Sequence, residues 1–166
     1  RMMTEYGLRI WGNIKDSLLA NDTPSEPVCQ ALMMASTVAG MAISHTGTSL
    51  PHGMSYYLTY EQHIPHGNAV GVFLPAFLDI FEDKDQVKRL LGLLGFKNEK
   101  AFTKYMDNLF EIVTVNEDDV DRYVKGMLSN EKKLANYPFT MTEEKFYKMF
   151  KNSVKIKKNG FFSFLR

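Results

Sequence analysis

The sequence predicts an all-α fold. Apolar residues recur at three- and four-residue spacings along most of the chain, and no stretch shows the alternation that is typical of a strand. Ser, Thr, Pro and Gly stand where the helices would begin and end. The chain has 166 residues, of which 45% are hydrophobic and 23% charged, enough for one domain with a sizeable core. These values exclude a disordered chain, and a single cysteine excludes a disulfide scaffold.

The first four expected helices follow directly from these patterns. The first spans residues 4–19, and the second spans 26–44, begins after Ser25 and is rich in small side chains. The third runs from 50 to 60 after Ser49. The fourth spans 65–81 and is expected to kink at Pro75, because proline cannot donate a helical hydrogen bond.

Further helices are expected over residues 86–94, 100–113, from 117–119 onward, and 143–154. Residues 1–154 would therefore form one helical domain. Residues 155–166 form a basic-aromatic tail that continues a run of basic side chains from Lys151; its residues include Lys155, Lys157, Lys158, Phe161, Phe162, Phe164, Leu165 and Arg166. A segment that docks on the domain or frays is favoured for this tail over a contact with membrane or nucleic acid.

Charge and hydropathy narrow the class of protein. Twenty basic and nineteen acidic residues give a net charge of +1, which argues against nucleic acid or a membrane surface as partner. No stretch of eighteen apolar residues and no signal peptide are evident, so no transmembrane helix is expected. The lone Cys29 suits a reducing cytoplasm. The chain opens on Arg1 directly into a helical pattern, which indicates a piece of a longer protein.

All four histidines, His45, His52, His63 and His66, fall within 22 residues. Such a cluster suggests a metal site, because neutral imidazole is a common ligand of divalent metals. His63 and His66 form one candidate pair around Pro65. His52 and His66, fourteen residues apart, form another if each lies at the start of a helix. A hydrogen-bonded histidine without a ligand role is the alternative for each of them.

The sequence around these histidines resembles the iron-containing (group III) alcohol dehydrogenase family. The matching features are the small-residue helix over 35–42, the turn over 47–51 that precedes His52, the Pro-His-Gly motif at His66 and the Leu-Pro step at 74–75. The resemblance implies the multi-helix C-terminal domain of the dehydroquinate synthase-like fold. It also implies an N-terminal nucleotide-binding domain, whose Gly-rich loop and D-x-x-x-H ligand motif are absent from this sequence.

The resemblance further implies that His52 and His66 bind a divalent metal, Fe²⁺ or Zn²⁺, while the absent domain holds most of NAD or NADP. The implied reaction is oxidation of a small alcohol, or reduction of an aldehyde, by metal-assisted hydride transfer. A homodimer is left open. Many family members carry a proton-relay histidine four residues after the first ligand, where this sequence has Tyr56. A tyrosine hydroxyl forms hydrogen bonds but does not titrate near neutral pH, so the relay is in doubt.

Two other functions stay open. The chain could be a stand-alone helical interaction module with a degenerate metal face, or a family member that has lost redox activity and binds another ligand. Tyr56 is the one hint of the latter. Tyr56, Tyr57 and Tyr60 could shape a substrate pocket, although packing is the favoured role, and His63 is expected on the exposed loop before His66. The isolated chain is expected to be inactive as a dehydrogenase.

Overall fold

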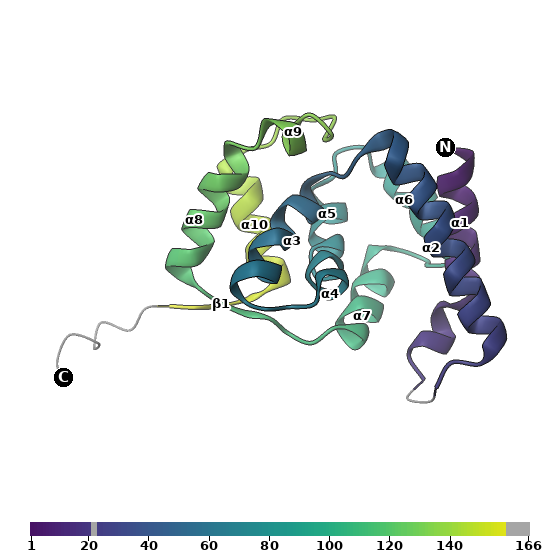
Figure 1. Cartoon of the computed structure of the whole chain (residues 1–166). Coiled ribbons are helices and arrows are strands. Elements are labelled where there is room, and N and C mark those ends of the chain that lie inside the picture. Colours follow the sequence, from purple (N-terminus) through teal and green to yellow (C-terminus); the bar gives the residue numbers. More distant parts are fainter. Residues whose placement is uncertain (21–22, 159–166) are drawn as a thin grey trace. The chain divides into compact units, whose positions relative to one another are not determined.

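Helices make up nearly all of the regular structure in this computed structural model, which describes residues 1–20 and 23–158 (Figure 1). The all-α prediction is confirmed. The helices are α1 (Met2–Ile14), α2 (Glu26–Thr46), α3 (Leu50–Glu61), α4 (His66–Gly71), α5 (Leu74–Ile80), α6 (Lys84–Leu93), α7 (Glu99–Leu109), α8 (Glu117–Leu128), α9 (Glu131–Leu134) and α10 (Glu143–Ser153), with a 3-10 turn η1 (Lys15–Leu18). The chain forms two compact units: unit 1 contains Arg1–Gly47 and Phe81–Leu109, and unit 2 contains Thr48–Ile80 and the chain from Phe110 onward.

Unit 1 is built on the pairing of α1 with α2. Gly7 is buried in this pairing, beside the backbone of Ala35 and the side chain of Val38. The Trp11 ring of α1 meets the edge of Tyr105 from α7, with ring centroids 5.6 Å apart. Aromatic packing of this kind joins the first helix of the chain to the α6–α7 segment.

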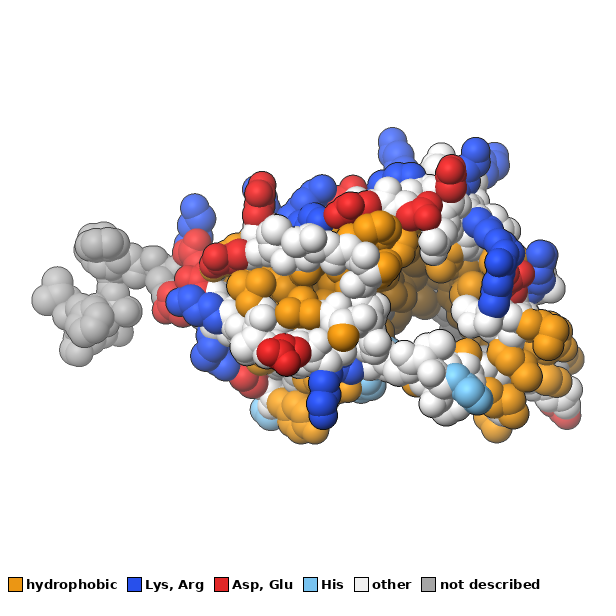
Figure 2. All heavy atoms as spheres, turned by 90° about the horizontal axis from the view of Figure 1, so that it is seen from above, with side chains coloured by type: hydrophobic (Ala, Val, Ile, Leu, Met, Phe, Trp, Pro, Cys, Tyr) orange, Lys and Arg blue, Asp and Glu red, His pale blue; other side chains and the backbone are white. Residues whose placement is uncertain are grey.

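The helix α2 carries an exposed apolar face, as Figure 2 shows at the right of the view. Met33 is 71% exposed and Met34 is 52% exposed, and Met41 and Ile43 continue the face. By length and composition this helix is also long and apolar enough to cross a membrane: its best window has a mean hydropathy of 1.4 and is 11% buried. Helix α2 meets this criterion because small and apolar residues outnumber the polar ones between Glu26 and Thr46. The expectation that the chain has no transmembrane helix stays a prediction.

Unit 2 has its core around α3, α5, α8 and α10. Leu50, Met54 and Leu58 form the fully buried face of α3, at the spacing of one side of a helix. Phe73 meets the edge of Phe150 from α10, with centroids 5.3 Å apart. Two short strands, β1 (Thr114–Asn116) and β2 (Lys155–Lys157), pair in parallel beside these helices.

The structure differs from the predicted elements in several places. α1 ends at Ile14 and α7 at Leu109, each before its expected end. Where a single kinked helix was expected, α4 ends at Gly71 and α5 begins at Leu74, so Pro75 falls in the first turn of a new helix that tolerates it. The four-residue helix α9 and the three-residue strands were not expected, because such short segments show no periodicity. Of the basic-aromatic tail, Lys155–Lys157 form β2, whereas Phe161, Phe162, Phe164, Leu165 and Arg166 lie outside the described residues.

Candidate metal centre

The local sequence at the start of α3 positions His52. Ser49 is the extended residue before the helix, and Pro51 occupies its first turn, where a missing N–H costs nothing. The hydroxyl of Ser55, which is fully buried, donates to the carbonyl oxygen of His52 at 2.8 Å. His52 is therefore held in the first turn of a helix whose opposite face is locked in the core.

The loop after α3 returns the chain to bring His66 beside this turn. The amides of Gln62 and Ile64 both donate to the carbonyl oxygen of Leu58, at 3.2 and 3.1 Å, which closes the loop tightly. His63 takes up the reversal with a φ of 56°. Pro65 then precedes His66, the first residue of α4. The expectation that His52 and His66 lie at the starts of successive helices is confirmed.

The imidazole rings of His52 and His66 come together, with centroids 5.4 Å apart and ring planes inclined by 65°. Metal–nitrogen bonds run at about 2.0–2.1 Å, so two imidazoles on one tetrahedral ion have ring centroids about 5 Å apart. The observed separation fits this arrangement. His66 is exposed and His52 is half-buried, so the pair is open to solvent on one side.

The surroundings of the pair favour the metal-binding form of His52. Burial lowers the pKa of His52 below its ordinary value of 6.5, and the neighbouring His66 and Lys133 lower it further. Its ring is therefore neutral at pH 7, as a ligand must be. The hydroxyl oxygen of Thr59 lies 3.5 Å from Nδ1 of His66, at the limit of a hydrogen bond. The contact is made by Nδ1, so Nε2 is the ring nitrogen that it does not involve.

Tyr56 belongs to the same cluster. Its ring stacks on His66 almost in parallel, with centroids 5.8 Å apart and planes inclined by 8°, and the side chain is 40% exposed. The other two tyrosines do not join it. Tyr57 stacks on Tyr123 of α8 with centroids 4.5 Å apart, and Tyr60 is 78% exposed.

The remaining histidines, His45 and His63, lie outside α3 and α4. His45 is exposed near the end of α2 in unit 1, where its Nδ1 lies 2.8 Å from the carbonyl oxygen of Met41. His63 is exposed on the loop, as expected. Within residues 1–20 and 23–158, no group of three or more His, Cys, Asp or Glu side chains converges to hold a metal ion. The two imidazoles of His52 and His66 are fewer than the four ligands of a tetrahedral metal site.

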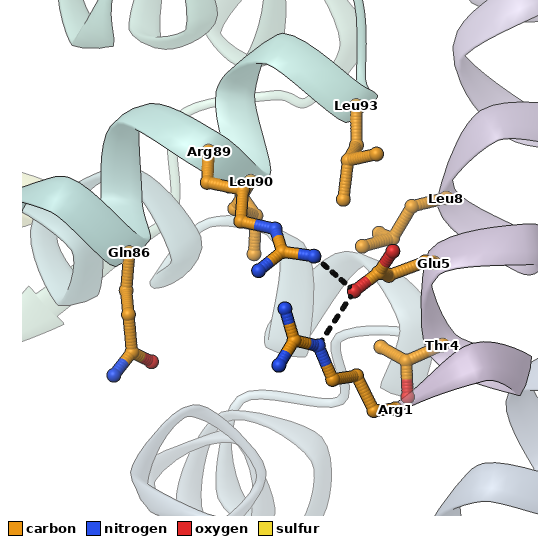
Figure 3. Close-up of a pocket in the computed structure, with 8 residues that line it drawn as sticks. All are labelled: Arg1, Thr4, Glu5, Leu8, Gln86, Arg89, Leu90 and Leu93. Atoms are coloured by element: carbon orange, nitrogen blue, oxygen red, sulfur yellow. Dashed lines mark hydrogen bonds and ion pairs between the residues drawn. The ribbon is translucent and has the colours of Figure 1, made fainter.

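A separate pocket of about 520 Å³ lies in unit 1 between α1 and α6 (Figure 3). It was not predicted from the sequence. Glu5 accepts hydrogen bonds in it from Nε of Arg1 at 3.0 Å and from Arg89 at 2.6 Å, and these contacts help to lower the pKa of its carboxyl group. Both guanidinium groups contact the single carboxylate of Glu5, so these three side chains together keep a net positive charge.

Comparison with known proteins decides the family. The family description "Fe-containing alcohol dehydrogenase family, C-terminal" matches residues 10–154. The chain belongs to the iron-containing alcohol dehydrogenase family. The crystal structure of an iron-containing alcohol dehydrogenase from Thermotoga maritima is similar over 92% of this chain and 42% of that one, with 27% identity and a TM-score of 0.79. A second iron-containing alcohol dehydrogenase structure is equally similar, with a TM-score of 0.79 and 27% identity over 92% of this chain and 41% of that one.

One curated relative carries a different name within the same family. The probable mitochondrial hydroxyacid-oxoacid transhydrogenase of Dictyostelium discoideum is 25% identical over 158 aligned positions, which cover 75% of this chain and 29% of that protein. The chain thus spans less than half the length of these relatives. The family resemblance seen in the sequence, and the C-terminal helical domain that it implied, are confirmed.

Sequence reasoning missed two side chains of the cluster. Lys133 comes from α9, and its ammonium group lies 5.3 Å from the centroid of the Tyr56 ring and donates to Oγ1 of Thr48. Thr48 and Lys133 are 85 positions apart in the chain. No local pattern in the charged run around Lys133 indicates that its side chain reaches Tyr56 and Thr48.

Proposed function

We propose that this chain forms the helical, metal-binding half of the active centre of an NAD(P)-dependent, iron-type alcohol dehydrogenase. His52 and His66 are two of the protein ligands of a divalent ion, Fe²⁺ or Zn²⁺. The observation that carries this proposal is the 5.4 Å separation of the two imidazole rings at the starts of α3 and α4. The oxidoreductase class comes from the family itself.

The chemistry that such an ion supplies when bound is Lewis-acid polarisation of an alcohol or carbonyl oxygen. The residues of this chain contribute position and charge. α3 and α4 hold the two imidazoles at a fixed separation, and the lowered pKa of His52 keeps its ring unprotonated. Tyr56, stacked on His66, replaces the relay histidine of many family members and limits motion of that ligand ring.

The remaining parts of the proposal concern the whole enzyme. The nicotinamide cofactor would be bound mainly by the nucleotide-binding domain that the family resemblance implies. Substrates would be small alcohols and aldehydes. The name of the Dictyostelium relative adds hydroxyacids and oxoacids to these candidates. A cytoplasmic location stays a prediction from the sequence, and whether the protein forms a homodimer stays open.

Metal titration of the chain tests the proposal. Zn²⁺ and Co²⁺ should bind with a stoichiometry near one and raise the unfolding temperature, because an ion that binds only the folded form stabilises it. The His52→Ala and His66→Ala variants should each abolish both effects. His45→Ala is the matched control, since it removes the same side chain from an exposed position in unit 1 and should change neither effect.

The histidine variants also separate the alternatives. Loss of binding in His63→Ala, with His52→Ala unaffected, would establish the His63–His66 pair instead. An unaltered chain that shows no metal-dependent shift in unfolding temperature favours the interaction-module hypothesis and contradicts the proposal. Calorimetry gives the affinity, and the absorption spectrum of bound Co²⁺ gives the number and kind of ligands.

A further inference from the structure

Lys133 occupies an unusual place for a lysine. Its ammonium group lies 5.3 Å from the centroid of the Tyr56 ring, and that ring stacks on His66. The same ammonium group donates to the hydroxyl of Thr48, just before α3. A positive charge is thus held beside Tyr56, in the cluster that also contains His66.

Contacts of α3 and α9 hold Lys133 in this position. The stem of Lys133 passes against Gly53, where an added Cβ would lie 3.1 Å from Cγ of the lysine and 2.7 Å from Cε of Met127. The side chain of Asn130 accepts from the amide of Lys133 at 3.2 Å and so caps α9. The amide group of Asn136 donates to the carbonyl oxygen of Thr48 at 3.0 Å. These contacts join α9 to the turn that carries His52.

The charge of Lys133 is not neutralised by a carboxylate. No Asp or Glu oxygen within the described chain forms an ion pair with its ammonium group, whereas Lys84, Arg89, Arg122 and Lys148 each have such a partner. Lys133 is half-buried, so its charge is only partly screened by water. The hydroxyl of Thr48 and the face of Tyr56 are neutral partners. An anionic group beside the histidine pair would complete the local charge balance.

We propose that Lys133 binds the carboxylate of a small hydroxyacid or oxoacid whose hydroxyl or carbonyl oxygen faces His52 and His66. This inference rests on the proposed function, because it assigns a substrate class to the same site. A single ammonium group suits one carboxylate, and a hydroxyacid presents its oxygen one or two carbon atoms away. Lys133 would thereby favour hydroxyacids over uncharged alcohols of the same size.

Two matched probes test the assignment. Lactate and 1,2-propanediol share a carbon skeleton and a secondary hydroxyl, and they differ in the carboxylate that replaces a CH₂OH group. Each is titrated into the full chain in the presence of Zn²⁺, and the dissociation constant is taken from NMR shifts of the His52, Tyr56 and His66 rings. Inorganic phosphate serves as a third probe.

Lactate should bind the unaltered chain more tightly than the diol does. The Lys133→Met substitution should raise the dissociation constant of lactate by about tenfold or more, because a hydrogen bond to a charged group is lost. Lys133→Arg should retain most of the lactate affinity. Lys132→Met is the matched control, because it removes the same charge from an exposed position in the same helix. It should leave the affinity for lactate unchanged. The affinity of the diol should be the same in all four proteins.

The outcomes separate this inference from the proposed function. Metal binding with a lactate affinity that Lys133→Met does not alter overturns the carboxylate assignment alone, as does an unaltered chain that binds no lactate. Phosphate binding that is as tight as lactate and equally dependent on Lys133 also overturns it. Lysine-dependent lactate binding in a chain that binds no Zn²⁺ supports the assignment and contradicts the proposed function. A native NMR spectrum of Lys133→Met excludes misfolding as the cause of its loss of lactate binding.

Discussion

The rings of His52 and His66 lie 5.4 Å apart because the loop after α3 turns back against its own helix. The two amides that donate to Leu58 and the positive φ of His63 achieve this reversal within a few residues. Neither ring depends on a flexible loop for its position, since each side chain belongs to the first turn of a helix. A preformed pair of this kind needs little ordering when it meets a ligand.

The first prediction concerns activity of residues 1–166 alone. No NAD(P)-linked oxidation of 1,2-propanediol or lactate is expected, with either Zn²⁺ or Fe²⁺ added, because two histidines bind an ion weakly and the sequence lacks the Gly-rich loop for the cofactor phosphates. The measurement is NAD(P)H absorbance over time. Turnover that His66→Ala abolishes would contradict this prediction and show that the chain is sufficient.

The second prediction concerns Gly53, which gives Lys133 its space. Gly53→Ala should lower the free energy of unfolding by about 1–3 kcal/mol, because the new Cβ would overlap Met127 and crowd the lysine stem. Gly40→Ala is the control: nothing lies within 4 Å of its Cβ position in α2, so it should stabilise the chain by about 0.5–1 kcal/mol. Urea unfolding measures both. Equal stability of the two variants would contradict the packing around Gly53.

The third prediction concerns acid sensitivity at the end of α3. Arg122 donates to both carboxylate oxygens of Glu61, and this interaction lowers the pKa of Glu61 below its ordinary value of 4.5. Since the unfolded chain then takes up the proton at a higher pH, the stabilisation is complete above about pH 4.5 and is lost as the pH falls through the lowered pKa. The side chain of Arg122 is 54% exposed and that of Glu61 is 35% exposed, so screening by water limits the stabilisation from this ion pair to at most about 1 kcal/mol.

Glu61→Gln should remove this part of the acid sensitivity. Urea unfolding at pH 7 and pH 3 gives the difference in stability between the two conditions, and this difference should be smaller in the variant. Glu111→Gln, which changes an exposed acid outside the helices of unit 2, should behave like the unaltered chain. An identical pH dependence in all three proteins would show that the Glu61–Arg122 ion pair does not contribute to the stability of the chain.

The fourth prediction concerns Tyr105 in unit 1, at the alkaline end of the pH scale. Its hydroxyl donates to the carbonyl oxygen of Lys15 at 2.6 Å, and burial raises its pKa from 10.0 to about 12. Its stabilisation is therefore complete below pH 10 and is lost as the pH rises toward 12. Tyr105→Phe should cost about 1 kcal/mol at pH 7 and should lose less stability than the unaltered chain between pH 9 and pH 11.

The control for Tyr105 is another tyrosine of unit 1. Tyr6→Phe removes a hydroxyl from a side chain that is 52% exposed on α1, so its effect at pH 7 should be close to zero. Both variants are compared by chemical unfolding monitored by circular dichroism. A Tyr6→Phe effect as large as that of Tyr105→Phe would assign the loss to tyrosine removal in general and not to the contact with Lys15.

The sequence by itself determined the helical fold and most helix positions, and it left two candidate histidine pairs, of which the family resemblance implied His52 with His66. Helix periodicity and capping depend on residues three or four positions apart, and the motif around His66 is equally local, so all of these can be read along the chain. The tertiary structure alone decided that α4 and α5 are separate helices, that Val115 pairs with Ile156, and that Lys133 reaches Tyr56. These contacts join distant segments through packing, which leaves no periodic trace in either segment.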